Sequence, residues 1–331
     1  MKAKKFLSMP AMLLLAGAMT LTSCDDILGE WDRPTPQTPA AAEEEPSVTF
    51  YVWDSTANKL VPKTVTGNIT TITETTTTWS GVCVVDKDIT ITGEVIMDDD
   101  VELIIADGVK LTIIGKIADA AHSLKLYGQE AKSGQFVVDN SAAAGKAIEV
   151  KGLEIAGLKV NVKAQTTAGS AAINTSGKTV IYDGADVTAN GNQGIFVNDG
   201  GELEILGGTL NLTSVAQNIW GPSLIISGGT ITASGDGNGG NGVINCTNVL
   251  IKNTISEIKI TNTAVSTEEK LSYWLNGSTS LKFGTSDTHV NADGNNIAAG
   301  GTLSGGSFDG IKIVRGTGSP ANKSLTITPN S

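Results

Sequence analysis

The chain has 331 residues, of which 40% are hydrophobic and 17% charged, so it can bury a substantial core and is not disordered as a whole. Its net charge is −11 and its only arginines are Arg33 and Arg315, which excludes a typical nucleic-acid binder because phosphate binding needs clustered Lys and Arg. Gly is abundant at 39 residues and aromatic residues are scarce at 5%, a composition that favours strands joined by tight turns.

Residues 1–23 are predicted to be a secretory signal: lysines near the start, an apolar run from about residue 11 to 18, then small residues. The run is too short for a membrane-spanning helix. The ending "LTSC" resembles a bacterial lipobox, which implies that Cys24 becomes the first mature residue and carries a lipid. The alternative is an ordinary cleaved signal in which Cys24 is incidental. With no later apolar stretch of spanning length, we expect any membrane attachment to go through Cys24.

Residues 24–46 are predicted to form a tether behind the lipidated cysteine. Asp25 and Asp26 resemble the surface-export signal of Bacteroidota lipoproteins, and "RPTPQTPAAAEEEP" over 33–46 is rich in Pro and Glu, which favours an extended stalk. Removal of the signal with its three lysines takes the net charge from −11 to −14. The expected location is the outer membrane, lipid-anchored and facing the cell exterior.

Residues 47–79 begin the folded part, either as an N-terminal cap or as a small β module, and the sequence leaves both open. Residues 80–331 are predicted to form one repeating domain with a C-terminal cap. Two ladders carry this prediction. Gly157, Gly184, Gly207 and Gly228 follow one another at intervals of 27, 23 and 21 residues, each before a short alternating strand. Ile148, Ile173, Ile195, Ile219 and Val243 follow at 25, 22, 24 and 24.

A period of 20 to 27 residues with about three short strands and no helix-forming segment is typical of one turn of a parallel β-helix. Like residues then stack on like about 4.8 Å apart, the aliphatic ladder fills the core, and Gly supplies positive φ at the corners. We therefore predict an all-β, right-handed parallel β-helix with irregular caps at both ends, the hand following from the general rule for parallel crossovers.

A resemblance supports this fold. The stretches "LIIADGVKLTI" (103–113) and "LKLYGQ" (124–129), followed by Gly-Gly-Thr repeats, are similar to a pattern in bacterial cell-surface proteins that are commonly described as carbohydrate-binding or adhesin-like. The repeats cover roughly residues 80–250. The resemblance implies a surface β-helix and, less specifically, a glycan or a surface protein as partner.

Alternation assigns the outward positions. If the isoleucine ladder points inward, one outward row holds Glu149, Asn174, Phe196, Trp220 and Ile244, and a second holds Lys151, Ser176, Asn198, Pro222 and Cys246. Adjacent aromatic rings on an outer face suit sugar stacking, so the carbohydrate-binding candidates are Phe196, Trp220, Asn174, Glu149 and Asn198. The alternative is that "LSYWLNGS", with Tyr273 and Trp274, packs over Phe196 and Trp220 and buries them.

Other residues are given structural roles. Tyr182 is placed on an inward register. Two polar rows are expected to be plain solvated ladders: Asp186, Thr209 and Thr230, and Thr188, Asn211 and Thr232. Cys83 and Cys246 are expected to be unpaired, buried thiols. His122 and His289 lack neighbours at metal-ligand spacing.

Catalysis is not expected. Neither the lyase constellation of a basic residue with Arg or Ca²⁺ nor the rung-spaced Asp clusters of glycosidases with this fold is recognisable here. A single Lys base such as Lys151 or Lys178, which needs no local motif, stays open. No cofactor is expected beyond Ca²⁺, whose weak candidate ligands are Asp98, Asp99 and Asp100. The predicted function is a non-catalytic carbohydrate-binding or adhesion module. The alternatives are a structural or protein-partner scaffold of the outer envelope and, third, a polysaccharide lyase or glycosidase.

Overall fold

The computed structural model describes residues 45–237, 242–264, 270–317 and 323–330, and residues 45–331 form one compact unit. The predicted signal, the lipidation site Cys24 and nearly all of the predicted tether lie outside the described residues. Strands make up 61% of the structure, and the helical content of the described part is one short 3-10 turn, η2 (Leu271–Tyr273).

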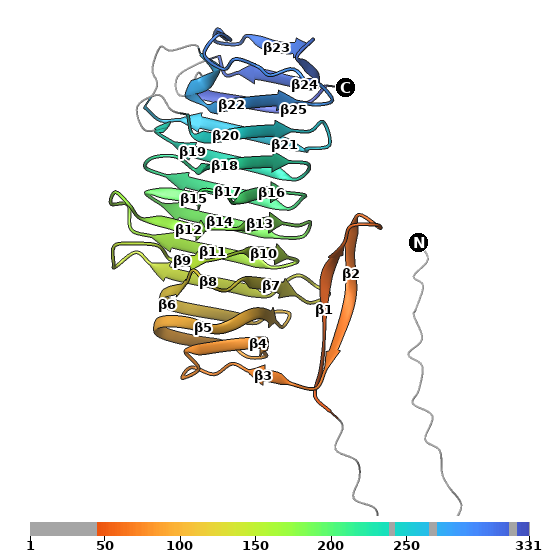
Figure 1. The fold of residues 1–331 in the computed structure, drawn as a ribbon, viewed down its shortest axis with the longest axis vertical. Coiled ribbons are helices and arrows are strands. Elements are labelled where there is room, and N and C mark those ends of the chain that lie inside the picture. Colours follow the sequence, from red (N-terminus) through yellow and green to blue (C-terminus); the bar gives the residue numbers. More distant parts are fainter. Residues whose placement is uncertain (1–44, 238–241, 265–269, 318–322, 331) are drawn as a thin grey trace, which may run out of the picture. The chain divides into compact units, whose positions relative to one another are not determined.

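The prediction of a parallel β-helix is confirmed: parallel strands stack as a β-solenoid of about seven turns (Figure 1). Each turn contributes one short strand to each of three faces. Several long strands bend around a corner and serve two or three faces, among them β4 (Thr78–Val85), β5 (Ile89–Ile105), β6 (Lys110–Asp119), β18 (Ile219–Ile226), β20 (Ile244–Ile251) and β22 (Leu275–Phe283).

The other strands of the parallel coil each belong to one face. The first face contains β3 (Ile69–Thr71), β7 (Leu124–Gly128), β10 (Leu153–Ala156), β13 (Lys178–Ile181) and β16 (Glu202–Ile205). The second face contains β8 (Gln135–Asn140), β11 (Lys159–Ala164), β14 (Asp186–Gly191), β17 (Thr209–Ser214), β19 (Thr230–Gly235) and β21 (Glu257–Asn262). The third face contains β9 (Ile148–Val150), β12 (Ala171–Thr175) and β15 (Gln193–Val197).

The strand registers agree with the predicted spacing over most of the coil. Lys159, Asp186, Thr209 and Thr230 pair in succession, which reproduces the intervals of 27, 23 and 21 residues. The inward ladder of the third face is Ile148, Ile173, Ile195, Ile219 and Ile244, each 0% exposed. The prediction was wrong at its last member, because Ile244 and not Val243 pairs with Ile219.

The core is a continuous column of aliphatic side chains. Each of the three faces sends every second residue inward, as the period of a strand requires. Burying one such Ile or Leu stabilises the fold by roughly 1.5–3 kcal/mol relative to exposure, before the entropy of ordering is subtracted. Because every turn repeats this burial on the turn before it, stability accumulates along the coil rather than in one central core.

The corner between the first and second faces explains the Gly-Gly pairs. Gly208 and Gly229 have φ of +78° and +82°, so the second glycine of each pair has the conformation predicted for Gly207 and Gly228. The first glycine is needed for a different reason: a Cβ at Gly228 would lie 2.2 Å from the carbonyl oxygen of Leu206 in the preceding turn. Both glycines are therefore imposed by the close stacking of successive corners.

Residues 47–66 form an antiparallel hairpin that lies along the first face, at the side of the coil (Figure 1). Its strands are β1 (Ser47–Asp54) and β2 (Lys59–Thr66). Phe50 is fully buried and stacks on Tyr127 with 5.1 Å between ring centroids, in a small core shared with Ile104 and Ala156. The parallel coil itself begins just after the hairpin, at β3. Residues 47–79 therefore contain both the hairpin, which packs on the side of the coil, and the first strand of the coil.

The C-terminal end of the coil is closed by antiparallel strands. β25 (Ser324–Pro329) pairs antiparallel with β21 and with β24 (Phe308–Arg315), and β24 pairs with β23 (Thr302–Gly305). β25 thereby occupies the free edge that β21 would otherwise present, which protects the last parallel rung of the second face from pairing with another chain.

Candidate functional site

The outward row of the third face contains the predicted aromatic pair. Strand pairing brings Glu149, Asn174, Phe196, Trp220, Asn245 and Asn276 into one row, each from a successive turn. The rings of Phe196 and Trp220 stack with centroids 4.4 Å apart and planes 11° apart, and both side chains are half-buried. The prediction that these two rings are neighbours on the outer surface is confirmed.

The prediction was wrong for the last residue of each outward row, Ile244 and Cys246. Ile244 points into the core, and Asn245 takes the place beside Trp220. Cys246 is also inward and only 3% exposed, whereas Thr247 is exposed. The cause is the one-residue register difference at Val243, since a shift of one residue exchanges the two sides of a strand. The expectation of two free, buried thiols is confirmed for Cys83 and Cys246.

Three of the predicted binding residues bond to other groups of the protein. Asn174 is only 2% exposed; its Nδ2 donates to the carbonyl oxygen of Phe196 at 3.4 Å, and its Oδ1 accepts from Nδ2 of Asn198 at 3.3 Å. Glu149 forms an ion pair with Lys146 at 3.2 Å. The Asn174 amide therefore links the backbone of Phe196 to the side chain of Asn198, which is half-buried.

A hollow of about 250 Å³ lies on the other side of Trp220, and we call it the Trp220 hollow. Its lining includes Trp220, Asn245 and Asn276, with Thr247 and Ser278 at exposed positions. Within the described part of the chain, the side-chain amides of Asn245 and Asn276 make no hydrogen bond. One aromatic ring and two amides with free donors and acceptors therefore surround the same small volume.

Tyr273 and Trp274 do not cover the aromatic pair in the way the alternative required. Trp274 is fully buried in the core, where its indole Nε1 donates to the carbonyl oxygen of Lys323 at 2.6 Å and the Arg315 guanidinium lies over its ring. Tyr273 packs against the same core. Phe196 and Trp220 consequently retain partial exposure in the described structure.

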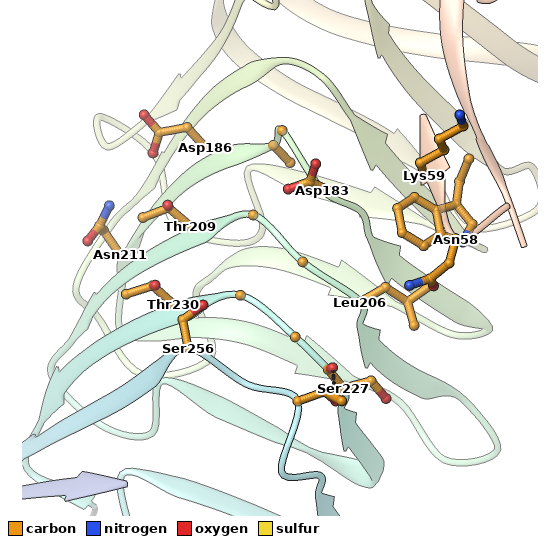
Figure 2. Close-up of a pocket in the computed structure, with 18 residues that line it drawn as sticks. Asn58, Lys59, Asp183, Asp186, Leu206, Thr209, Asn211, Ser227, Thr230 and Ser256 are labelled. Atoms are coloured by element: carbon orange, nitrogen blue, oxygen red, sulfur yellow. Dashed lines mark hydrogen bonds between the residues drawn. The ribbon is translucent and has the colours of Figure 1, made fainter. Parts of the chain in front are cut away.

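A second candidate site is a groove of about 720 Å³ between the hairpin and the corner that joins the first and second faces (Figure 2). We call it the hairpin groove. Figure 2 shows Asp186, Thr209 and Thr230 on successive strands along one side and Asn58 and Lys59 on the other. The glycines of the corners also line the groove. Four residues of the rows predicted to be plain solvated ladders thus form one wall of this groove: Asp186, Thr209, Thr230 and Asn211.

Trp53 and Tyr182 explain how the hairpin wall is built. Tyr182 was predicted to point inward, but it is half-buried on the outer side of the first face, and Trp53 stacks on it with 5.6 Å between centroids and 24° between planes. Burial and the nearby Glu154 carboxylate raise the pKa of Tyr182 to about 12, so it stays neutral at physiological pH. Trp53 also lines the groove, and sequence reasoning missed it because no local pattern indicates where the hairpin docks.

The acidic run at 98–100 has a structural role in the described fold. Asp99 accepts a hydrogen bond from the backbone N–H of Asp100, and Asp100 accepts one from the backbone N–H of Ser123 in the next turn. No group of three or more His, Cys, Asp or Glu side chains suited to a metal ion occurs among the described residues. Nor does that part of the chain contain a helix long and apolar enough to cross a membrane.

No protein-family model, no curated protein and no solved structure matches the chain.

Proposed function

We propose that this protein is a lipid-anchored protein of the outer membrane that binds carbohydrate through the Trp220 hollow, as a non-catalytic binding or adhesion module. The observation that carries the proposal is a half-exposed tryptophan, held in place by a stacked neighbour, beside two amides without partners in the described part of the chain. Ligand sites commonly combine such an apolar surface with a few converging polar groups.

The geometry suits a sugar for two reasons. Pyranose rings present C–H groups that pack on an aromatic face, and the stack on Phe196 fixes the Trp220 ring so that little rotamer freedom is lost on binding. The amides of Asn245 and Asn276 offer both donors and acceptors, which match hydroxyl groups that also donate and accept.

The rest of the chain agrees with a surface module. A lipid on Cys24 and the Pro- and Glu-rich segment after it would hold the coil away from the membrane. The net charge of −14 that follows signal removal disfavours polyanionic ligands and favours neutral glycans.

A glycan array probed with the full chain tests the proposal. We expect binding to at least one neutral glycan and its loss in Trp220→Ala, because the stacking surface is removed. Ser176→Ala is the matched control, an exposed position on the same face away from the hollow, and it should bind like the wild type. If the folded wild type binds no glycan, or if Trp220→Ala binds equally well, the proposal is wrong and a protein-binding scaffold becomes the better account.

A further inference from the structure

The hairpin groove is a separate site from the Trp220 hollow. It opens at the corner between the first and second faces, while the hollow lies on the third face, and the two share no lining residue. The groove also spans several turns, from Asp183 and Asp186 through Thr209 and Thr230 to Ser256. With neighbouring strands about 4.8 Å apart, three such steps extend on the order of 14 Å along the coil.

The groove has three different kinds of lining. Its floor is the Gly-Gly corners, where the absence of side chains leaves backbone at the surface. One wall carries hydroxyl, carboxylate and amide groups at rung spacing, from Thr209, Asp186 and Asn211. The opposite wall is the hairpin, which contributes the indole of Trp53. A ligand in the groove meets an aromatic surface on one side and repeated polar groups on the other.

The charges favour a neutral ligand. Asp183 and Asp186 are exposed and form no ion pair within the described part of the chain, whereas Lys59 is the single cationic side chain in the lining. A polyanion would therefore meet two carboxylates against one ammonium group. A polyol is better matched, because carboxylate and amide oxygens accept hydrogen bonds from its hydroxyl groups.

A peptide strand is a poorer match. Extended peptides usually bind by adding to an unpaired sheet edge. The strands beside the groove, β14, β17 and β19, each pair with a neighbour on both sides, so they present no free edge there. A ligand in the groove can therefore contact the rows of side chains but not unpaired backbone groups of the sheet.

We infer that the hairpin groove binds an extended neutral oligosaccharide, with its chain running along the coil so that successive sugars meet successive turns. Trp53 packs against a sugar face, and the polar row of Asp186, Thr209, Asn211 and Thr230 receives the hydroxyl groups. The docked hairpin is then a functional wall of the site as well as a cover for the first face.

Calorimetric titration of the full chain with four hexasaccharides tests this inference: cello-, manno- and chito-oligosaccharides as neutral probes and oligogalacturonate as the acidic one. We expect a neutral hexasaccharide to bind, and its affinity to fall at least tenfold in the double variant Thr209→Ala/Asn211→Ala and in Trp53→Ala. The double variant leaves the hairpin contacts intact, so it remains informative if Trp53→Ala disturbs the docking.

Two controls separate the groove from the hollow. Thr213→Ala changes an exposed residue of the same strand that does not line the groove, and its affinity should equal that of the wild type. Trp220→Ala should also retain this binding. Failure of every neutral probe, tighter binding of oligogalacturonate, or an affinity that depends on Trp220 and not on the groove variants would overturn the inference.

Discussion

At the scale of single residues, the corner glycines show how closely successive turns approach. Gly229 has φ of +82° and a Cβ there would lie 2.6 Å from the carbonyl oxygen of Gly208. Gly200 has a similar φ of +88°, but a Cβ there would meet nothing within 4 Å. A substituted residue would therefore suffer the same backbone strain at both positions, but it would be crowded by the preceding turn only at Gly229.

We predict that Gly229→Ala destabilises the protein clearly more than Gly200→Ala. The conformational strain alone costs about 1–2 kcal/mol, which is the loss expected for Gly200→Ala. Crowding against the preceding turn adds to that loss at Gly229. Thermal unfolding followed by circular dichroism measures the difference, and equal melting temperatures for the two variants would contradict the stacking argument.

The buried thiol of Cys246 gives a pH-dependent prediction. Burial raises its pKa to about 12, above the usual value of 9.0. The protonated thiol therefore contributes stability that is fully present below pH 9 and is lost as the pH rises toward 12, at up to about 1.4 kcal/mol per pH unit. Denaturant unfolding between pH 8 and about 11 should show a shallower fall for Cys246→Ala than for the wild type, and identical slopes would argue against the burial.

At the scale of elements, the hairpin is held to the coil by two aromatic contacts, Phe50 on Tyr127 and Trp53 on Tyr182. Phe50 is fully buried against Tyr127, and Lys63 adds an ion pair with Glu102 at 3.2 Å on the exposed side. An exposed pair of this kind adds little, so packing dominates the docking.

We predict that Phe50→Ala destabilises the protein by about 3–5 kcal/mol or releases the hairpin, because it removes a large buried ring. Thr66→Ala, an exposed position at the end of β2, is the control and should change stability by less than about 0.5 kcal/mol. Limited proteolysis between residues 54 and 69 reports release of the hairpin directly. A Phe50→Ala variant as resistant and as stable as the control would show that the hairpin docks by other contacts.

The elements also show what could be predicted from the sequence. The parallel coil and most of its register were predictable, because inward Ile residues and corner glycines recur with each turn. The predicted register was wrong at Val243 and Ile244. Both residues are apolar and fully buried, so hydrophobicity could not decide which of them continues the inward ladder. Asn245 and Asn276 were missed as a consequence.

The contacts of the hairpin could not be predicted for a different reason. Trp53 and Tyr182 are 129 positions apart in the chain, and their stacking depends on how the hairpin docks. No repeat links them, so Tyr182 looked like a core residue. The side-chain rows of the hairpin groove were predicted, whereas the wall that turns them into a groove was not.

At the scale of the whole molecule, we propose separate roles for the lipid anchor and the coil. Cys24 is proposed to fix the chain to the membrane, while both candidate sites lie within residues 45–331. We predict that Cys24→Ser moves the protein from the membrane fraction to the soluble fraction and removes the mass of the lipid, with glycan binding unchanged. Intact-protein mass spectrometry on both fractions checks this, and a lipid mass retained in Cys24→Ser would refute attachment at that residue.

The proposed function depends on sugar binding at the Trp220 hollow. The most direct measurement is a crystal structure of the chain with the neutral glycan that binds best on the array. We expect a sugar ring packed on Trp220, with its hydroxyl groups within hydrogen-bond distance of Asn245 and Asn276. A glycan bound elsewhere, with the Trp220 hollow empty, would contradict it.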